Sequence, residues 1–448
     1  MDDRAVSSIE KPPTTFGGSL RRLGPGLILS ASIVGSGELI ATTALGARVG
    51  FTMIWVILLA CLFKVALQVE YGRYCIVHGR SALEGWNLGG GPRALGLHWS
   101  LFVAFLFLLS MVVGQGGVLG AAAQVGLEVA PALGIAGWVL LLALLIGVLL
   151  SRGSYRPVEL LAIGMNTIFL LVLGYCLVAI EATDYRFGLA DLLSGLRFEL
   201  PTKGVMLALG TFGIVGLGAA EILIYTYWCL EKGYAAWTGP REDSPEWRQR
   251  ARGWIGVMAL DSIVSMIVYT TATCGFYLLG AAVLRAQPAL EDGNGLVVQL
   301  SALFTEVLGR RSRSIFLLGG FTVLFSTAFA NTAGFARLWS DLLRLAGWLG
   351  PNRFVSRRKS IELLTWAQPV IWAVVYLALQ APLFMVVLMG VANTLFLLVV
   401  AWKAVAFRYR LNRGILDPPI WYDVALWIGV ATTTFVGARG FWASIVPN

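Results

Sequence analysis

The chain has 448 residues, of which 57% are hydrophobic and only 13% are charged, and its formal net charge is +9. A soluble domain carries roughly 25% charged residues, so the composition excludes a water-soluble globular protein and makes lipid the expected solvent. The positive charge does not indicate nucleic acid as a partner, because Lys and Arg stand in short segments between apolar runs. The expected partners are the lipid bilayer and a small solute, and no pattern indicates an oligomeric state.

Apolar runs recur along the whole chain, and each is about 20 residues long, enough to cross the hydrocarbon core as a helix. The short alternating segments of a membrane β-barrel are absent. We therefore predict an all-α polytopic membrane protein with about eleven transmembrane helices. These helices are expected at residues 24–48, 51–75, 98–127, 134–151, 156–181, 203–232, 253–284, 314–345, 361–379, 383–407 and 419–438.

The loops predict the orientation and the organisation of the chain. Most of its 34 Lys and Arg residues fall on the same side as the N-terminus, and positive loops stay in the cytoplasm. We expect a multi-pass protein of the cytoplasmic membrane with the N-terminus inside and, after an odd number of helices, the C-terminus outside. The expected parts are a cytoplasmic tail at 1–23, five-helix repeats at 24–181 and 203–407, and a last helix with the C-terminus at 408–448.

The first and sixth predicted helices share a pattern in mid-membrane. Gly35-Ser36-Gly37 precedes Glu38 in the first, and Gly216 and Gly218 precede Glu221 in the sixth. The second copy lies five helices after the first, so it crosses the bilayer in the opposite direction. Inverted repeats with glycine-interrupted helices at matching positions indicate a transporter binding site. We predict helix breaks at Gly37, Gly216 and Gly218, where glycine tolerates an irregular backbone.

Three ionisable side chains stand near the middle of their predicted helices. Glu38, Glu221 and Lys64 are costly in lipid, and such residues mark ion or substrate sites by default. One interpretation is a cation site built from both glutamates, the Ser36 hydroxyl and backbone carbonyls freed by the breaks. The other is a buried structural pair of protonated acids. Lys64 either compensates the charge of one glutamate or extends toward the headgroups.

Several segments resemble one known family. Gly24-Pro25-Gly26 opens the first helix, residues 58–84 form a characteristic second helix and loop, and Ser326-Thr327 precedes Ala333-Gly334 in the eighth helix. On these residues the chain resembles the natural resistance-associated macrophage protein (Nramp) family of divalent-metal transporters. The resemblance implies the LeuT-like fold of two inverted five-helix repeats with broken helices 1 and 6.

The departures from the family pattern fall on its metal motifs. Where the family has Asp-Pro-Gly-Asn this chain has Gly35-Ser36-Gly37-Glu38, and where the family has Met-Pro-His it has Ala219-Ala220-Glu221. The resemblance thus implies a substrate site at Gly35, Ser36, Glu38, Ala219 and Glu221. With the sulfur ligand lost, the remaining oxygen ligands suit hard ions such as Mg²⁺ or Mn²⁺. A magnesium-transporting branch of the family is similarly altered and is the nearest analogue.

Three functions follow. The first is a secondary transporter or channel-like carrier of a divalent cation, Mg²⁺ or Mn²⁺, with weak or no proton coupling, because Gly114 and Gly117 stand where the family has its proton-pathway acids. The second is a carrier of a small organic solute such as an amino acid, and the third is a membrane sensor that transports nothing. No catalytic constellation is present, so we expect no enzyme and no cofactor; a metal ion would be the transported substrate.

Overall fold

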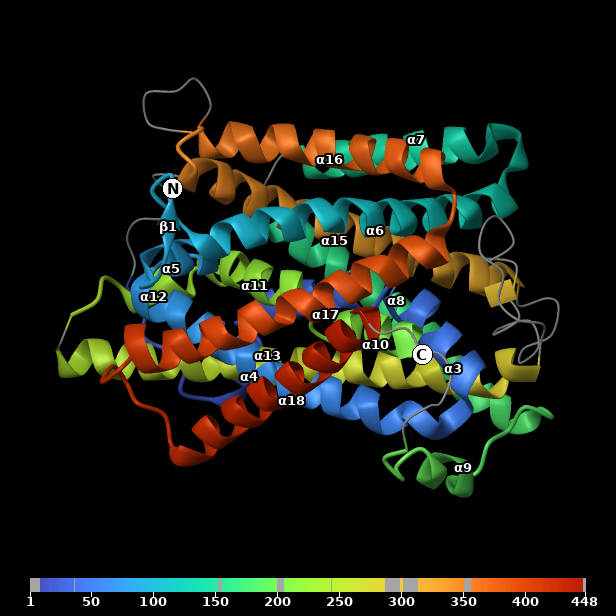
Figure 1. Ribbon diagram of the computed structural model, residues 1–448, viewed down its shortest axis with the longest axis horizontal. Helices are drawn as coiled ribbons and strands as arrows, with labels where there is room; N and C mark the ends of the chain where they lie inside the picture. The colour runs from blue at the N-terminus through green and yellow to red at the C-terminus, as the bar shows by residue number, and fades with distance from the viewer. Residues whose placement is uncertain are drawn as a thin grey trace.

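The protein, described as a computed structural model, is a bundle of helices that run along its longest axis, horizontal in Figure 1. The structure describes residues 9–35, 37–151, 155–199, 205–242, 244–286, 299–300, 313–349 and 356–445. The long helices are α4 (Ile54–His78), α6 (Trp99–Val129), α7 (Gly134–Leu150), α8 (Tyr155–Ala179), α13 (Pro245–Ala282), α15 (Arg313–Leu345), α16 (Arg357–Leu379), α17 (Pro382–Ala406) and α18 (Ile420–Ile445).

Two further transmembrane helices are each made of two halves. The first comprises α2 (Pro25–Ile33), a π-helical turn η1 (Gly37–Thr42) and α3 (Thr43–Val49), and the sixth comprises α10 (Val205–Ile214) and α11 (Ala219–Lys232). The structure thus has the predicted breaks in helices 1 and 6.

Short elements connect the spans. They are α1 (Phe16–Leu20), η2 (Gly50–Met53), α5 (Ala82–Leu88), η3 (Pro131–Leu133), η4 (Ile180–Ala182), α9 (Leu189–Ser194), α12 (Tyr234–Thr238), η5 (Leu284–Ala286) and η7 (Phe407–Leu411). A two-stranded antiparallel hairpin, β1 (Arg93–Ala94) and β2 (Leu97–His98), pairs Arg93 with His98. It lies beside α5 at the left of Figure 1.

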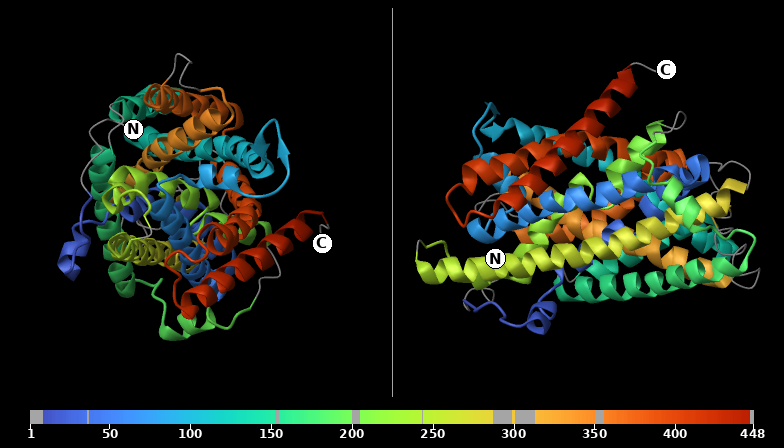
Figure 2. Two further views of the ribbon diagram at one scale, coloured as in Figure 1. Left: turned by 90° about the vertical axis from the view of Figure 1, so that its left-hand side faces the viewer. Right: turned by 90° about the horizontal axis from the view of Figure 1, so that it is seen from below.

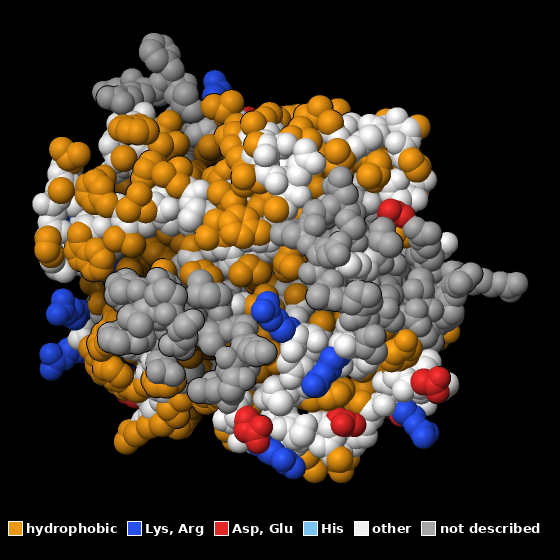
Figure 3. Space-filling model, turned by 45° about the vertical axis from the view of Figure 1, so that its right-hand side comes forward, with side chains coloured by type: hydrophobic (Ala, Val, Ile, Leu, Met, Phe, Trp, Pro, Cys, Tyr) orange, Lys and Arg blue, Asp and Glu red, His pale blue; other side chains and the backbone are white. Residues whose placement is uncertain are grey.

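Within the described ranges, ten continuous stretches are long and apolar enough to cross a membrane. One of them, Gly37–His78, joins the second half of helix 1 to helix 2, so the ten stretches correspond to the eleven predicted helices. In chain order, transmembrane helices 2, 3, 4, 5, 7, 8, 9, 10 and 11 are α4, α6, α7, α8, α13, α15, α16, α17 and α18. Apolar side chains cover most of the part of the face in Figure 3 that is not drawn in grey, and charged ones are few. The chain is therefore an integral multi-pass membrane protein.

Glycines allow the helices at the centre to approach closely. A Cβ placed on Gly213 of α10 would lie 1.9 Å from the carbonyl oxygen of Gly390 on α17, and one on Gly280 of α13 would lie 2.5 Å from the carbonyl oxygen of Thr43. Lipid gives helices no hydrophobic reason to associate, so close packing of small residues supplies much of the attraction. These contacts hold both broken helices against α13 and α17.

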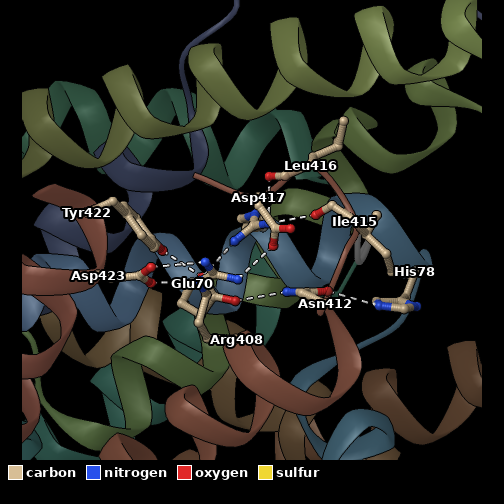
Figure 4. A network of polar contacts seen from close by, with 10 residues as sticks. Glu70, His78, Arg408, Asn412, Ile415, Leu416, Asp417, Tyr422 and Asp423 are labelled. Atoms are coloured by element: carbon tan, nitrogen blue, oxygen red, sulfur yellow. Dashed lines mark hydrogen bonds and ion pairs between the residues drawn. The ribbon is translucent and has the colours of Figure 1, made fainter. Parts of the chain in front are cut away.

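A buried polar network, the Glu70 network, joins α4 to the chain around α18 (Figure 4). The Glu70 carboxylate accepts hydrogen bonds from Asn412 Nδ2 at 2.9 Å, from the Tyr422 hydroxyl at 2.7 Å and from Arg73 at 3.4 Å. Arg73 also donates to the carbonyl oxygens of Ile415 and Leu416. The loop before α18 is thereby tied to helix 2.

The same network continues at Arg408. Its guanidinium donates to both carboxylate oxygens of Asp423, at 2.7 and 3.0 Å, and to Asp417 at 2.9 Å. Paired, two-point contacts of this kind fix geometry as well as charge. They orient the start of α18, which crosses the bundle obliquely and projects from it in the right-hand view of Figure 2.

Candidate functional site: the broken helices and the central cavity

The break in helix 1 places Glu38 at the start of its second half. Val34 leaves the helical conformation, with φ −68° and ψ 87°, and η1 begins at Gly37. The Glu38 carboxylate accepts hydrogen bonds from the Gly35 amide and from the Thr273 hydroxyl of α13, each at 3.1 Å. Glu38 is fully buried, and its carboxylate therefore ties the break to helix 7.

Gly35 packs directly against helix 8. A Cβ at this position would lie 1.6 Å from the Thr327 hydroxyl oxygen, so only glycine fits without moving the α15 backbone. Ser36, which the sequence analysis places in the site, lies outside the described residues.

The break in helix 6 exposes two helix ends of opposite polarity. Gly216 adopts φ +61°, a left-handed conformation that favours glycine. Lys64 of α4 donates to the carbonyl oxygens of Phe212 and of Val215, the latter at 3.0 Å, where α10 ends. Glu221 stands in the first turn of α11. An ammonium at a helix C-terminus and a carboxylate at an N-terminus both oppose the helix dipole.

The hydrogen bonds of Lys64 go to the backbone, while Glu221 and Glu38 interact with its charge from a longer distance. Its side chain is 1% exposed, and its hydrogen bonds go to backbone carbonyls. Among the residues that the structure describes, it forms no ion pair with Glu38 or Glu221, and it does not extend toward the headgroups. Compensation of a glutamate charge by Lys64 therefore stays a prediction.

A small central cavity lies beside these breaks, with a volume of about 20 Å³. It has room for roughly one water molecule or one ion. Its walls come from helices 1, 3, 6, 8 and 10, and they are Ser32, Ile33, Gly37, Met111, Gln115, Ile214, Glu221, Thr327, Asn331, Phe335, Met389 and Asn393.

The cavity separates the predicted site residues into two groups. Glu221 and Gly37 line it, whereas Glu38, Gly35, Ala219, Gly216, Gly218 and Lys64 do not. Ala219 begins α11, and its amide donates to Asn393 Oδ1 at 3.0 Å. A Cβ on Gly218 would lie 2.3 Å from Glu221 Oε2, so the glycine makes room for that carboxylate.

Sequence reasoning missed the amide side chains of the cavity. Asn331 Nδ2 donates to Gln115 Oε1 at 3.2 Å. Asn331 is 2% exposed, yet its Oδ1 has no hydrogen-bond donor. A buried unsatisfied oxygen is costly, and a bound cation would satisfy it. The available signal was the presence of Gln115, Asn331 and Asn393 in otherwise apolar helices.

Two methionines complete the wall and change the expected ligand chemistry. Met389 Sδ lies 3.5 Å from Gln115 Nε2, and Met111 Sδ lies 3.5 Å from Asn393 Nδ2. Helices 3 and 10 thus bring thioethers to this cavity, in addition to the oxygen ligands that the sequence analysis expects. In the described part of the chain, no group of three or more His, Cys, Asp or Glu residues is placed to hold a metal ion.

Helix 3 has no space for acidic side chains at the two positions that the resemblance equates with the proton pathway. A Cβ on Gly114 would lie 2.2 Å from Met389 Cβ, and one on Gly117 would lie 2.8 Å from Met385 Cβ. Helix 10 fills the volume that longer side chains at these positions would need.

Comparisons with solved structures show the same fold. The manganese transporter of Eremococcus coleocola, in complex with an aromatic bis-isothiourea compound, superposes with a TM-score of 0.71 at 14% identity, over 100% of this chain and 92% of that chain. Mhp1, a nucleobase-cation-symport-1 family transporter, gives a TM-score of 0.55 at 11% identity, over 98% and 97%. These likenesses confirm the predicted LeuT-like fold.

The sequence comparisons identify its family. The model of the natural resistance-associated macrophage protein-like family matches residues 26–443, so the chain belongs to that family. The family consists of transporters rather than enzymes. An uncharacterised protein of Pasteurella multocida is 26% identical over 355 residues, which is 76% of this chain and 74% of that protein. The resemblance noted in the sequence is confirmed.

Proposed function

We propose that the protein carries a divalent metal ion, Mn²⁺ foremost, across the cytoplasmic membrane through the central cavity. The observation that carries the proposal is the buried Asn331 oxygen without a donor, in a cavity that Glu221 also lines. A carboxylate together with amide oxygens favours a cation over an anion. The membership of the family and the likeness to a manganese transporter support the same substrate class.

The cavity favours Mn²⁺ over Mg²⁺. Magnesium dehydrates reluctantly and usually keeps several waters, whereas about 20 Å³ accommodates roughly one water molecule. A largely dehydrated transition-metal ion fits this volume better than a hydrated magnesium ion.

An amino-acid substrate is the second candidate, and the volume argues against it. An amino acid has several times the volume of a water molecule, so it does not fit the central cavity in this conformation. The Gly35 amide, which could have held a substrate carboxylate, instead donates to Glu38.

Weak proton coupling is part of the proposal. The two helix-3 positions carry no side chain that could relay a proton. Glu221 remains the one ionisable side chain among those that line the cavity. Transport that depends on the metal gradient rather than on a pH gradient is the expected result. The cytoplasmic location of the N-terminus follows from the loop charges and belongs to the same proposal.

Uptake into proteoliposomes tests the function directly. The purified protein is reconstituted, and uptake of Mn²⁺, Mg²⁺, Cd²⁺ and a set of amino acids is measured with and without a pH gradient. Saturable Mn²⁺ uptake that exceeds Mg²⁺ uptake and responds little to the pH gradient is expected. Amino-acid uptake without any metal uptake would replace the proposal with the organic-solute carrier. Acidification of the lumen in fixed ratio to metal uptake would overturn the weak coupling.

A further inference from the structure

A second cavity, the Lys403 pocket, is separate from the central cavity and shares no lining residue with it. Its volume is about 70 Å³, and its walls include Leu88, Gly89, Gly90, Lys403, Phe407 and Arg410. Its walls come from α5 with the residues that follow it and from the end of α17 with η7. Figure 1 shows α5 at the left. This is the end that the loop charges assign to the cytoplasm.

Lys403 keeps a buried positive charge in this pocket. Lys403 is 9% exposed, and its Nζ lies 3.2 Å from His98 Nδ1. That nitrogen also accepts from the Ser100 amide at 3.2 Å, which places the ring proton on Nε2, 3.4 Å from the Gly90 carbonyl oxygen. Burial and the neighbouring Lys403 charge lower the pKa of His98. A neutral imidazole orients the ammonium without neutralising it.

Arg410 adds a second cation beside the same loop. Arg410 Nη1 lies 4.0 Å from the place of a Cβ on Gly90, and Lys403 Nζ lies 3.6 Å from the place of a Cβ on Gly89. Neither cation pairs with a carboxylate among the described residues, although the neighbouring Arg408 pairs with two. Two converging cations without a carboxylate make a site for an anion.

The surroundings of the pocket indicate a membrane interface. Trp99 and Trp402 are 41% and 52% exposed, and exposed tryptophans are typical of the headgroup level. Lys403 Nζ also lies 5.6 Å from the centre of the Trp99 ring. Basic pockets between transmembrane helices on the cytoplasmic side are suited to acidic lipid headgroups.

We propose that the Lys403 pocket binds the phosphate group of an anionic phospholipid, with Lys403 and Arg410 as its charged ligands. The small Gly89–Gly90 loop leaves room for the phosphate oxygens, and the exposed tryptophans mark the headgroup level beside it. The site is separate from the central cavity, so it does not depend on which ion the protein carries.

Lipid binding by the full-length protein tests this site. Native mass spectrometry in a non-ionic detergent compares phosphatidylglycerol, phosphatidylcholine and inorganic phosphate as probes. The variants are Lys403→Met and Arg410→Gln; Arg358→Gln is the matched control, because Arg358 is exposed and already paired with Glu362. Phosphatidylglycerol is expected to bind the wild type more tightly than phosphatidylcholine, and each pocket variant is expected to weaken it by about fivefold.

Three results of this experiment would contradict the proposal. Equal binding of the two lipids to the wild type, or unchanged phosphatidylglycerol binding in both pocket variants, would overturn it. Binding of inorganic phosphate that Arg410→Gln removes, without preference for phosphatidylglycerol, would assign the pocket to free phosphate instead. Arg410 is exposed, so its variant preserves the test if Lys403→Met fails to fold.

Discussion

The central cavity and the Glu70 network both bury carboxylates within one helix bundle, but they satisfy them differently. In the network Glu70 has three hydrogen-bond donors, one of them the cation Arg73. At the breaks neither Glu38 nor Glu221 is paired with Lys or Arg in the described chain.

This difference distinguishes carboxylates with a structural role from carboxylates that are available to a ligand. A carboxylate whose partners are all supplied by the protein has no capacity left for a ligand, and removing one partner is costly. A carboxylate without a cationic partner, beside an amide oxygen without a donor, has that capacity. The network therefore holds α18 in place, and the central cavity is where we propose that a cation binds.

Glu70→Ala is expected to have the largest effect, and on stability. It leaves Arg73 as a buried cation without its carboxylate, which costs about 3–5 kcal/mol. The midpoint of chemical unfolding in detergent measures the loss. Arg358→Gln, at an exposed pair, is the control and should change stability by about 0–1 kcal/mol. A small loss in Glu70→Ala would show that the network is not needed to hold helix 11.

Glu221→Gln is expected to weaken metal binding rather than folding stability. It keeps the shape of the side chain but removes the one negative charge that lines the central cavity, so Mn²⁺ affinity should fall by about tenfold or more, roughly 1.4 kcal/mol. Folding stability should hold or rise, because a buried charge is lost. Isothermal titration and unfolding of the same preparation measure both quantities. Unchanged metal affinity would move the binding site away from this cavity.

Glu38→Gln sharpens the comparison within the site. Glu38 is held by Gly35 and Thr273 and does not line the cavity. Its replacement should therefore weaken Mn²⁺ binding less than Glu221→Gln does, through the altered break rather than through a lost ligand. Equal losses in the two variants would indicate that both carboxylates reach the ion in another conformation.

Met111→Leu and Met389→Leu test the thioethers. Leucine preserves much of the volume but removes the sulfur. Cd²⁺ affinity should fall by a few-fold, Mn²⁺ affinity by less, and Mg²⁺ affinity should be unchanged, because only softer ions gain from sulfur. Competition between the three metals in the titration gives the ratios. If the sulfurs do not contact the ion, the affinities for all three metals would fall equally.

Lys64→Met is expected to have the smallest net effect. Removing a cation near Glu221 should raise metal affinity by a few-fold. The carbonyls of Phe212 and Val215 lose their donor at about 1–3 kcal/mol each, while the relief of a buried charge offsets that loss. Titration together with unfolding separates the two consequences. Weaker metal binding would show that Lys64 serves the site by holding the end of α10.

Much of the fold follows from patterns that are local in the chain. Apolar runs of spanning length predict the helices, and glycines next to Glu38 and Glu221 predict the breaks, because membrane helices need apolar length and unwinding needs backbone freedom. The exact limits of the helices shift by a few residues. The family resemblance rests on short segments such as Gly24–Gly26 and survives the loss of both metal motifs.

The central cavity could be predicted only in part. Glu221 stood out because it is charged in mid-membrane, but Asn331 and Met389 belong to helices that no motif connects to the breaks. The reason that helix 3 has Gly114 is likewise visible only once α17 lies against it. A sequence shows which residues are unusual for lipid, and it does not show which way each helix is turned.

By itself, the sequence determined that this is a polytopic helical protein with two interrupted helices and three ionisable groups in mid-membrane, because these properties depend on composition and spacing along one segment. The tertiary structure alone decided that Lys64 binds the end of α10, that Glu38 turns to Thr273 while Glu221 faces the cavity, and that two thioethers join it. These outcomes depend on contacts between residues more than a hundred positions apart. Helix packing selects such contacts by the fit of whole helix faces, which no local pattern encodes.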